Sequence, residues 1–402
     1  MTWNRAFDLT MEIKHAYADQ FGDEDLYSGD NWLRHWVDSL GNDVYSTVMD
    51  ELIVKQCGDL ALLHYGIPHD MDGTDFFQAY GGIFRECRSL VIDLRNETMV
   101  LTPFSKFRNL GECEECSVEN VMRLIERAKV VEFSEKLDGS MQSARIVGGR
   151  LVMSGSKGLD RSQSYRLDGG YGYVESHDNY MKMLADHPDW TFIFESIFEN
   201  DPHVVVYDEE GLYLVGIRDS ADGREFDYRE VIGVAEAYGI PTTALYDLSF
   251  DEALAFLERT SGKEHEGFVL NVDSFRVKMK SDDYVRINGW IFGLRHDDIL
   301  LKAVLAGEID DILPKLPKAY RDDVEVRAGR IFEAIDRRRR TVESYYLALK
   351  DEGFDTRKDS MIWIERNVPS KYRTMVRMKY LGQDVDYGKG LTVSEVFGTK
   401  DE

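Results

Sequence analysis

Cysteine is scarce in this sequence, and a long apolar run is missing. The four cysteines, Cys57, Cys87, Cys113 and Cys116, agree with a reducing compartment. Cys113 and Cys116 form a C-x-x-C pair, but no second pair or nearby histidine completes a zinc site, so we expect free thiols. No apolar run approaches the roughly 20 residues that a membrane helix needs, and the N-terminus opens no signal peptide. We therefore expect a soluble, cytoplasmic protein with no membrane partner.

Cations are also in short supply. Lysine and arginine total 49 against 74 aspartates and glutamates, which gives a formal net charge of −25. This balance disfavours a polyanionic partner in bulk, but a local binding site depends on where its cations lie. The acid excess therefore does not exclude a nucleic acid, and an acidic surface would also suit a high-salt environment.

The chain is long enough for roughly two or three domains, and 43% of its 402 residues are apolar. Helical spacing of apolar residues predicts an N-terminal helical extension over 1–55. Short β-rich runs broken by Gly, Asp and Asn predict a single domain over 56–290, and helical spacing returns over 291–402. No internal repeat or low-complexity tract is present. We expect an α+β fold, with an antiparallel, β-rich central domain and an all-helical C-terminal domain.

Two segments of the central domain are typical of β-hairpins. One covers 204–218, where two apolar runs flank Asp208-Glu209-Glu210-Gly211. The other covers 268–280, and a two-residue turn at Asp273-Ser274 would pair Phe268 with Met279 on an apolar face. Because side chains alternate along a strand, the opposite face would carry Gly267, Lys278 and Lys280.

The segment Glu135-Lys136-Leu137-Asp138-Gly139-Ser140 is the most informative stretch. A lysine that attacks phosphorus needs a rigid strand edge, a nearby carboxylate such as Asp138, and a backbone such as Gly139 that can approach a nucleotide. Alone, a K-x-D-G match is weak, but Phe194-Glu195, Glu266-Gly267 and Lys278-Met279-Lys280 follow it in order. This ordered set predicts a covalent nucleotidyltransferase.

Each residue of the set has an expected role in that chemistry. Lysine has an unperturbed pKa near ~10.4 and is protonated at pH 7, when it cannot attack. We expect Lys278 and Lys280 to converge on Lys136, lower its pKa and bind a triphosphate. Glu266 is the natural ligand for Mg²⁺, which favours carboxylates, waters and phosphate oxygens. Glu195 is placed to accept a ribose hydroxyl.

Further motifs stand in a fixed order around this set. They are Arg85-Glu86-Cys87-Arg88-Ser89-Leu90-Val91, Thr102-Pro103-Phe104-Ser105-Lys106-Phe107, Gly155-Ser156-Lys157-Gly158, Glu266-Gly267-Phe268-Val269 and Val277-Lys278-Met279-Lys280-Ser281-Asp282. With them, the chain from about Leu60 to Ile287 resembles the phage-type RNA ligases that repair tRNA, the RNA ligase 1 clade of the covalent nucleotidyltransferases. The resemblance implies an ATP-grasp-like nucleotidyltransferase fold for the central domain.

The resemblance also implies a three-step reaction that uses ATP and Mg²⁺, with Mn²⁺ as a substitute. Lys136 attacks the α-phosphorus of ATP and releases pyrophosphate, the AMP passes to an RNA 5′-phosphate, and a 3′-hydroxyl displaces it. The substrate would be a single-stranded or nicked tRNA-like RNA, the protein a monomer, and its location the host cytoplasm if it is viral.

Residue roles carry over to matching positions. Arg88 and Lys106 resemble cations that engage the nucleotide phosphates and the RNA 5′-phosphate, and Lys157 a further phosphate contact. Tyr65 is similar to a tyrosine near the nucleotide. The remaining matches are Asp138 and Gly139 of the lysine motif, Glu195 for ribose, Glu266 and Gly267 for metal and nucleotide, and Lys278 with Lys280 for the lysine pair.

Three positions depart from the family's pattern. Ser89 stands where a glycine is usual, which predicts a tighter backbone. Arg108 replaces an aromatic residue, which leaves the adenine stacking partner open. His203 lies near the place of an arginine. None of these departures removes a residue that the covalent chemistry requires.

The C-terminal part is less informative. Arg337–Arg340 covers more than one helical face, and the basic residues of a last helix, Lys371, Arg373, Arg377 and Lys379, suit either RNA contacts or a solvated face. By resemblance, a helical C-terminal domain confers preference for a tRNA-like substrate.

Other functions share the lysine motif. ATP-dependent DNA ligases and capping guanylyltransferases normally carry a β-rich OB domain after the lysine pair, whereas residues from Trp290 onward read as helical. A catalytically silent RNA-binding protein is the alternative from another class, and it would have lost a motif residue.

Overall fold

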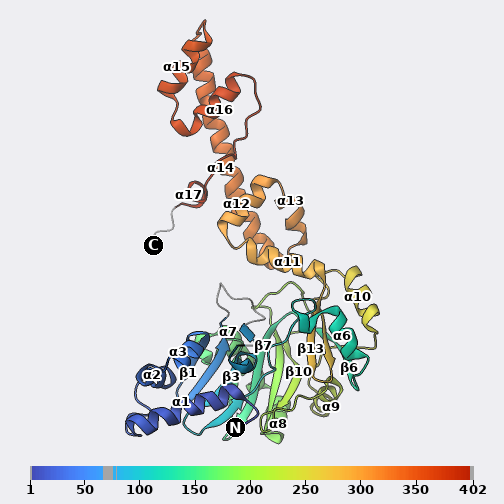
Figure 1. The fold of residues 1–402 in the computed structure, drawn as a ribbon. Coiled ribbons are helices and arrows are strands. Elements are labelled where there is room, and N and C mark those ends of the chain that lie inside the picture. The colour runs from blue at the N-terminus through green and yellow to red at the C-terminus, as the bar shows by residue number, and fades with distance from the viewer. Residues whose placement is uncertain (1, 67–75, 78, 399–402) are drawn as a thin grey trace. The chain divides into compact units, whose positions relative to one another are not determined.

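The structure, a computed structural model, describes residues 2–66, 76, 77 and 79–398. Its chain divides into two compact units, Met1–Tyr284 and Val285–Glu402, and each is described by itself. The described residues of the first unit form three β-sheets with helices packed on them (Figure 1).

The first sheet has the order β1-β2-β3-β4 and is entirely antiparallel. Its strands are β1 (Leu52–Cys57), β2 (Leu60–Tyr65), β3 (Arg88–Asp93) and β4 (Thr98–Leu101). Three N-terminal helices share one apolar core with it: α1 (Arg5–Phe21), α2 (Trp32–Leu40) and α3 (Asp43–Asp50). Each helix is preceded by an N-cap asparagine whose side chain accepts a backbone N–H from the first turn; these are Asn4, Asn31 and Asn42. The helical extension expected over 1–55 ends earlier than predicted, because strand β1 already begins at Leu52.

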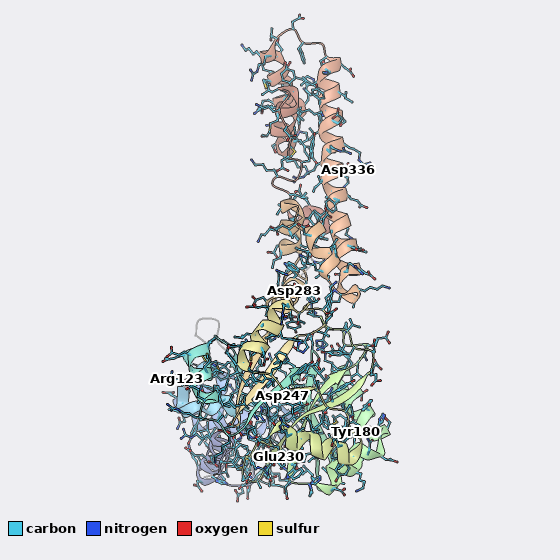
Figure 2. The ribbon with its side chains drawn as sticks, turned by 90° about the vertical axis from the view of Figure 1, so that its right-hand side faces the viewer. Arg123, Tyr180, Glu230, Asp247, Asp283 and Asp336 are labelled. Atoms are coloured by element: carbon cyan, nitrogen blue, oxygen red, sulfur yellow. The ribbon has the colours of Figure 1, made fainter. Side chains whose placement is uncertain are left out.

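The second sheet has the order β10-β9-β7-β8, with β7 (Ser140–Val147), β8 (Arg150–Gly155), β9 (Trp190–Ile197) and β10 (Gly211–Asp219). Its core includes residues from α7 (Tyr165–Ser176), α8 (Asp178–Asp186) and α9 (Tyr228–Tyr238). Tyr180 of α8, labelled in Figure 2, is buried in this core and donates to the carbonyl oxygen of Leu212 at 2.6 Å.

The hairpin expected over 204–218 is wrong. β10 pairs with β9 and not with the segment before it, which forms no strand. The physical reason is that the N–H groups of Val204 and Val205 donate to the side chain of Asp138, at 2.8 and 3.0 Å, and so are not available to a ladder.

The third sheet has the order β11-β6-β12-β13-β5 and carries the lysine motif. Its strands are β5 (Arg108–Asn109), β6 (Val131–Lys136), β11 (Leu245–Tyr246), β12 (Gly267–Val272) and β13 (Phe275–Lys280). All neighbours are antiparallel except β13 and β5. Helices α6 (Val118–Ile125) and α10 (Phe250–Arg259) contribute to its core.

The hairpin predicted over 268–280 is confirmed residue by residue. Phe268 pairs with Met279, both are buried, and Gly267 pairs with Lys280. The turn residues Asp273 and Ser274 have φ angles of 48° and 72°, as a two-residue turn that follows the twist of the strands requires.

Short elements complete the first unit: η1 (Ala79–Gly82), α5 (Ile83–Glu86), η2 (Glu114–Cys116) and η3 (Arg161–Gln163). The boundary between the units falls inside α11 (Asp282–Gly293). The second unit, in the part that the structure describes, is helical, as expected. Its further elements are α12 (Asp297–Ala306), α13 (Ile309–Ile312), η4 (Leu313–Lys315), α14 (Lys318–Asp351), α15 (Arg357–Asn367), α16 (Ser370–Tyr380) and α17 (Val393–Phe397).

The predicted α+β class is thus confirmed, with antiparallel sheets followed by a helical C-terminal region. Among the described residues, no helix combines the length and the apolar character needed to cross a membrane.

Candidate active site

The third sheet brings the lysine motif and the lysine pair together. Lys136 ends β6, and Gly267 at the start of β12 pairs with Lys136 on one side and Lys280 on the other. Only glycine fits between them, because a Cβ atom on Gly267 would lie 1.9 Å from the carbonyl oxygen of Met279. Residues far apart in the sequence therefore meet at one end of adjacent strands. The hairpin pattern predicted the pairing of Gly267 with Lys280, and the pairing of β12 with β6 adds Lys136.

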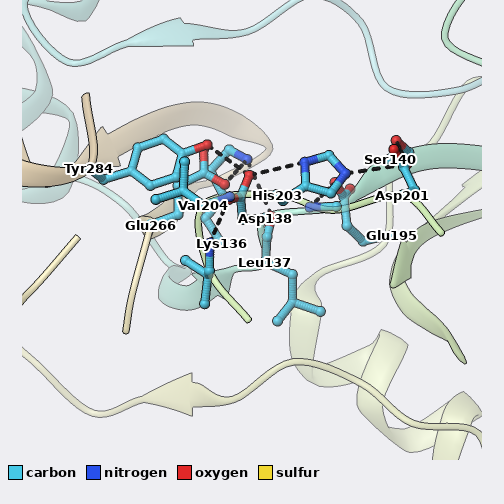
Figure 3. Close-up of polar contacts among 12 residues, drawn as sticks. Lys136, Leu137, Asp138, Ser140, Glu195, Asp201, His203, Val204, Glu266 and Tyr284 are labelled. Carbon is cyan, nitrogen blue, oxygen red and sulfur yellow. Dashed lines mark hydrogen bonds and ion pairs between the residues drawn. The ribbon is translucent and has the colours of Figure 1, made fainter. Parts of the chain in front are cut away.

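Glu266 joins Lys136 and Lys280 in an ion triad, of which Figure 3 labels Lys136 and Glu266. Its Oε2 lies 2.8 Å from Nζ of Lys136, and its Oε1 lies 2.9 Å from Nζ of Lys280. Only 2% of the Glu266 side chain is exposed, so this carboxylate meets two ammonium groups rather than water.

The pKa of Lys136 is shifted in the direction opposite to the one expected. Burial acts to lower the pKa of Lys136, but the carboxylates of Glu266, Glu195 and Asp138 outweigh it and raise the pKa above its ordinary value. The expected lowering by neighbouring cations is therefore wrong for the ligand-free protein. The reason is that Glu266 lies directly against Lys136, a contact that spacing along the chain does not reveal.

The lowered pKa belongs to Lys278 instead. Burial, reinforced by the charges of Arg88, Lys106, Lys136 and Lys280, lowers the pKa of Lys278 to about 6. Such a group is largely neutral at pH 7 and gains a proton when an anion binds beside it. The cations around Lys278 make a site that the negative charge of a polyphosphate would complement.

Arg88 carries a second sign of an anion site. Its Nη1 atom is buried and has no hydrogen-bond partner among the residues that the structure describes. The ring of Phe107 lies 4.9 Å from the guanidinium of Arg88 and also 4.9 Å from Nζ of Lys278. A buried donor without an acceptor is costly, and a nucleotide phosphate would supply the acceptor.

Asp138 organises the loop that follows Lys136 (Figure 3). Its Oδ2 accepts the N–H groups of Val204 and Val205, and its Oδ1 accepts the hydroxyl of Tyr284 at 2.7 Å. Burial acts to raise the pKa of Asp138, but hydrogen bonds from His203, Val205 and Tyr284 hold that pKa below its ordinary value. Asp138 is thus an ionised anchor of the loop.

Gly139 and Glu195 lie against each other. The N–H of Gly139 donates to Oε1 of Glu195 at 3.2 Å, and a Cβ atom on Gly139 would meet the carbonyl oxygen of Ser196 at 2.5 Å. Burial raises the pKa of Glu195 to about 7, although Lys136 opposes the shift. Because a Cβ atom would meet Ser196 of β9, only glycine at position 139 lets the chain that enters β7 lie this close to β9.

His203 bridges two buried aspartates, which the sequence did not indicate. Its Nδ1 lies 3.6 Å from Asp138, and its Nε2 lies 3.3 Å from Asp201. Asp201 also accepts the hydroxyl of Ser140 at 2.6 Å and pairs with Arg166 at 2.7 Å. Asp201 and Tyr284 were missed because no motif marks them, and only the fold brings them to Asp138.

Part of this site lines a cavity of about 260 Å³. Of the predicted site residues, the cavity is lined by Arg88, Lys136, Gly139, Glu195, Lys278 and Lys280. Apolar and aromatic residues complete its wall, including Phe104, Phe107, Met141, Ile193 and Phe226. This mixture of aromatic and cationic side chains suits a ligand that has both a flat base and phosphates.

Six predicted residues are not part of this wall: Asp138, Glu266 and Gly267, whose contacts are given above, and Tyr65, Lys106 and Lys157. Nζ of Lys106 lies 5.2 Å from the ring centroid of Tyr65. Lys157 lines a neighbouring cavity. The charges of Lys157, Arg88 and Lys106, added to burial, lower the pKa of His64 to about 4, so these cations form one cluster.

The departures from the family's pattern also have structural outcomes. Ser89 has a φ of 68°, a conformation natural to glycine, and its hydroxyl donates to the carbonyl oxygen of Ser156 at 2.5 Å. Arg108 lies 5.2 Å from the ring of Phe77 and does not line the cavity, whereas Phe107 does.

A metal ion would have to be held by few protein ligands. No group of three or more His, Cys, Asp or Glu side chains within the described residues is arranged to hold one, and the described cysteines are free thiols. Glu266 with Glu195 nearby fits Mg²⁺, because this ion commonly uses one or two carboxylates plus waters and substrate phosphates.

Comparisons with known proteins agree with this site. A family model described as RNA ligase matches residues 86–284. A putative RNA ligase of Thermovibrio ammonificans is 30% identical over 242 residues, 57% of this chain and 60% of the relative. RNA ligase 1 of Bacteriophage TS2126 is 26% identical over 251 residues, 60% of each chain. The chain thus spans about 60% of the length of these relatives.

Among solved structures, an archaeal ATP-dependent RNA ligase is similar with a TM-score of 0.42 and 16% identity, over 74% of this chain and 68% of that one. A Naegleria gruberi RNA ligase with pyrophosphate is similar with a TM-score of 0.34 and 16% identity, over 41% of this chain and 54% of that one. The matched segment of the family model contains the motifs from Arg88 to Lys280. Over this segment the chain is similar to the RNA ligase family, as its motifs predicted.

Proposed function

We propose that this protein is an ATP-dependent RNA ligase that joins a 5′-phosphate to a 3′-hydroxyl, with broken tRNA-like RNA as its substrate in the cytoplasm. The observation that carries the proposal is the Lys136–Glu266–Lys280 triad, whose two lysines line a cavity together with Arg88 and Lys278. The family assignment of 86–284 supports it.

In the first step, the amine of Lys136 attacks the α-phosphorus of ATP. A nitrogen–phosphorus bond forms, the bond from the α-phosphorus to the bridging oxygen breaks, and pyrophosphate leaves. Lys136 must lose a proton first, and Glu266 at 2.8 Å is placed to accept it. Arg88 and Lys278 are placed to bind the phosphates, which carry the developing charge.

The remaining residues position the nucleotide and the nucleophile. Glu195 would accept a ribose hydroxyl, and Phe107 would stack on the base, as its place in the cavity wall suggests. Glu266 and Glu195 would hold Mg²⁺ or Mn²⁺, which when bound supplies charge neutralisation at the phosphates. AMP then moves to the RNA 5′-phosphate and is displaced by the 3′-hydroxyl.

An intact-mass measurement tests this proposal. Purified protein is incubated with Mg²⁺ and ATP, with GTP or NAD⁺ as controls, and the modified residue is mapped. A gain of one AMP on Lys136, dependent on ATP, supports the ligase. No adduct with any nucleotide would favour a silent RNA-binding protein, and a GMP adduct would favour a capping enzyme.

The DNA ligase and capping alternatives are less well supported by the second unit. Over 285–398, which the structure describes, helices take the place of the β-rich OB domain that those enzymes carry. Joining assays with RNA and DNA strands of equal sequence separate the RNA ligase from a DNA ligase, because only a DNA ligase would prefer DNA.

A further inference from the structure

A second cavity opens beside the nucleotide cavity, and the chemistry above does not use it. Its volume is about 580 Å³, within the range of ligand sites. Its wall comes from β1, the start of β7, the end of β8, and the segment that leads into α7. Met141 and Ser156 line both cavities, so a molecule in the second cavity can reach the reacting centre.

The charge of this second cavity is opposite to that of the protein. Lys55, Lys157 and Arg166 line it, against a single carboxylate, Asp160. Asp160 is already engaged, because its Oδ1 accepts the N–H of Ser162 at 2.9 Å. In a chain of net charge −25, a concave surface with this excess of cations selects an anion.

Two of these cations are not neutralised. Lys55 and Lys157 are exposed, and neither forms an ion pair with any residue in the described part of the chain. The basic residues of α16 differ: Lys371, Arg373 and Lys379 lie 3.5, 2.9 and 2.6 Å from Glu395, Glu365 and Glu343, respectively. Arg339 and Arg340 of α14 pair with Asp336, labelled in Figure 2. Positive charge that is free to meet a ligand therefore lies in the cavity.

The third cation links the cavity to the lysine motif. Nε of Arg166 lies 2.7 Å from Asp201, a carboxylate with 3% of its side chain exposed. Asp201 accepts the hydroxyl of Ser140, four residues after Lys136. The cavity wall and the catalytic loop are therefore held by the same buried carboxylate.

We propose that this cavity binds the phosphodiester backbone of the RNA strand next to the joint, with Lys55, Lys157 and Arg166 contacting its phosphates. The inference rests on the proposed ligase function and extends it to the path of the RNA. Lysine and arginine contacts to successive phosphates are the general means of holding a strand without reading its sequence. Lys55 lies outside the matched family segment, in β1.

Charge reversal at Lys55 tests the proposal. K55E should form lysyl-AMP as the wild type does, because the first step needs no RNA. Its KM for RNA in joining should rise at least tenfold, and the slope of log affinity against log salt should fall by about 0.7 for each phosphate that the variant no longer neutralises. K129E is the matched control, since Lys129 is exposed beyond the far end of β6 from Lys136. An unchanged KM in K55E would overturn the inference.

Cys57 offers a second readout without a substitution. It lines the same cavity and is exposed, whereas Cys87 and Cys116 are buried. RNA should slow its alkylation by a maleimide, and peptide mapping separates Cys57 from Cys113. One arm uses a 5′-phosphorylated strand with a blocked 3′ end, and the other a strand with a 3′-hydroxyl and no 5′-phosphate. Protection in either arm supports the inference and identifies the strand, and protection in neither overturns it.

Failure of this inference and failure of the ligase proposal give different results. A wild-type protein that forms no lysyl-AMP would refute the ligase. A wild type that joins RNA, with K55E joining equally well and Cys57 reacting equally fast, would refute only the strand path.

Discussion

At the scale of residues, the charge of Lys136, the proposed nucleophile, is set by its contact with Glu266. Lys136 is held protonated by Glu266, so it is inactive until the carboxylate is drawn away or takes the proton. K136A should therefore form no nucleotide adduct, because no other lysine occupies its place between Glu266 and Leu137. Intact mass after incubation with ATP measures this, and K129A should match the wild type. An AMP adduct of normal yield in K136A would contradict the assignment.

His203 gives a second residue-scale prediction, on pH. Burial acts to lower the pKa of His203, but hydrogen bonds and charges from Asp138 and Asp201 raise it from 6.5 to about 9. A raised folded-state pKa contributes stability that is complete below 6.5 and is lost as the pH rises through 9. The groups facing the imidazole are Asp138, Asp201 and, through its charge, Glu195.

H203Q should therefore have a free energy of unfolding about 1–3 kcal/mol below that of the wild type at pH 6. The difference should shrink as the pH rises past 9, because the wild type then loses the same charge. Urea titrations of both proteins between pH 6 and 10 measure it. A difference that stays constant with pH would show that the histidine acts through packing alone.

At the scale of elements, the β12–β13 hairpin depends on Gly267. A Cβ atom there would lie 1.9 Å from the carbonyl oxygen of Met279 and 2.8 Å from Cα of Lys280, so the ladder must open. G267A should lower the free energy of unfolding by about 1–3 kcal/mol and reduce lysyl-AMP formation. Gly172 of α7 is the matched control, since its Cβ would meet nothing within 4 Å, and G172A should be neutral or stabilising by about 0.5–1 kcal/mol. Equal melts for the two variants would contradict this role.

The two hairpin predictions show which elements a sequence can specify. The β12–β13 hairpin was predictable because alternation and a two-residue turn are local signals. The segment 204–218 has equally apolar runs but forms no hairpin, because Asp138, 66 residues from Val204, takes its N–H groups. For the same reason, the motif residues of the site could be found from their order, while Asp201 and Tyr284 could not. Residues that reach the site only through tertiary contacts, such as Asp201 and Tyr284, produce no recognisable pattern in the sequence.

At the scale of the whole molecule, the excess of acidic residues is compatible with the proposed ligase function, because the cations that would bind phosphates are grouped around two cavities. In the first unit, Lys55 and Lys157 line one cavity and Arg88 and Lys278 line the other, and none of the four forms an ion pair within the described residues. The cations Lys371, Arg373 and Lys379 of α16, in contrast, pair with glutamates. The first unit therefore contains the residues of the proposed adenylation site. The predicted substrate preference of the second unit has to come from surfaces other than a free cationic helix.

This division predicts the result of a truncation. A chain ending at Arg295 keeps all of α11, including Tyr284, whose hydroxyl donates to Asp138. It should still form lysyl-AMP, but its preference for a nicked stem-loop RNA over an unstructured strand should disappear. A chain ending at Ser281 removes Tyr284, leaves Asp138 one donor short, and should adenylate poorly. Adduct yield and paired joining assays measure both effects. If the longer truncation kept the full preference, substrate choice would have to reside in the first unit.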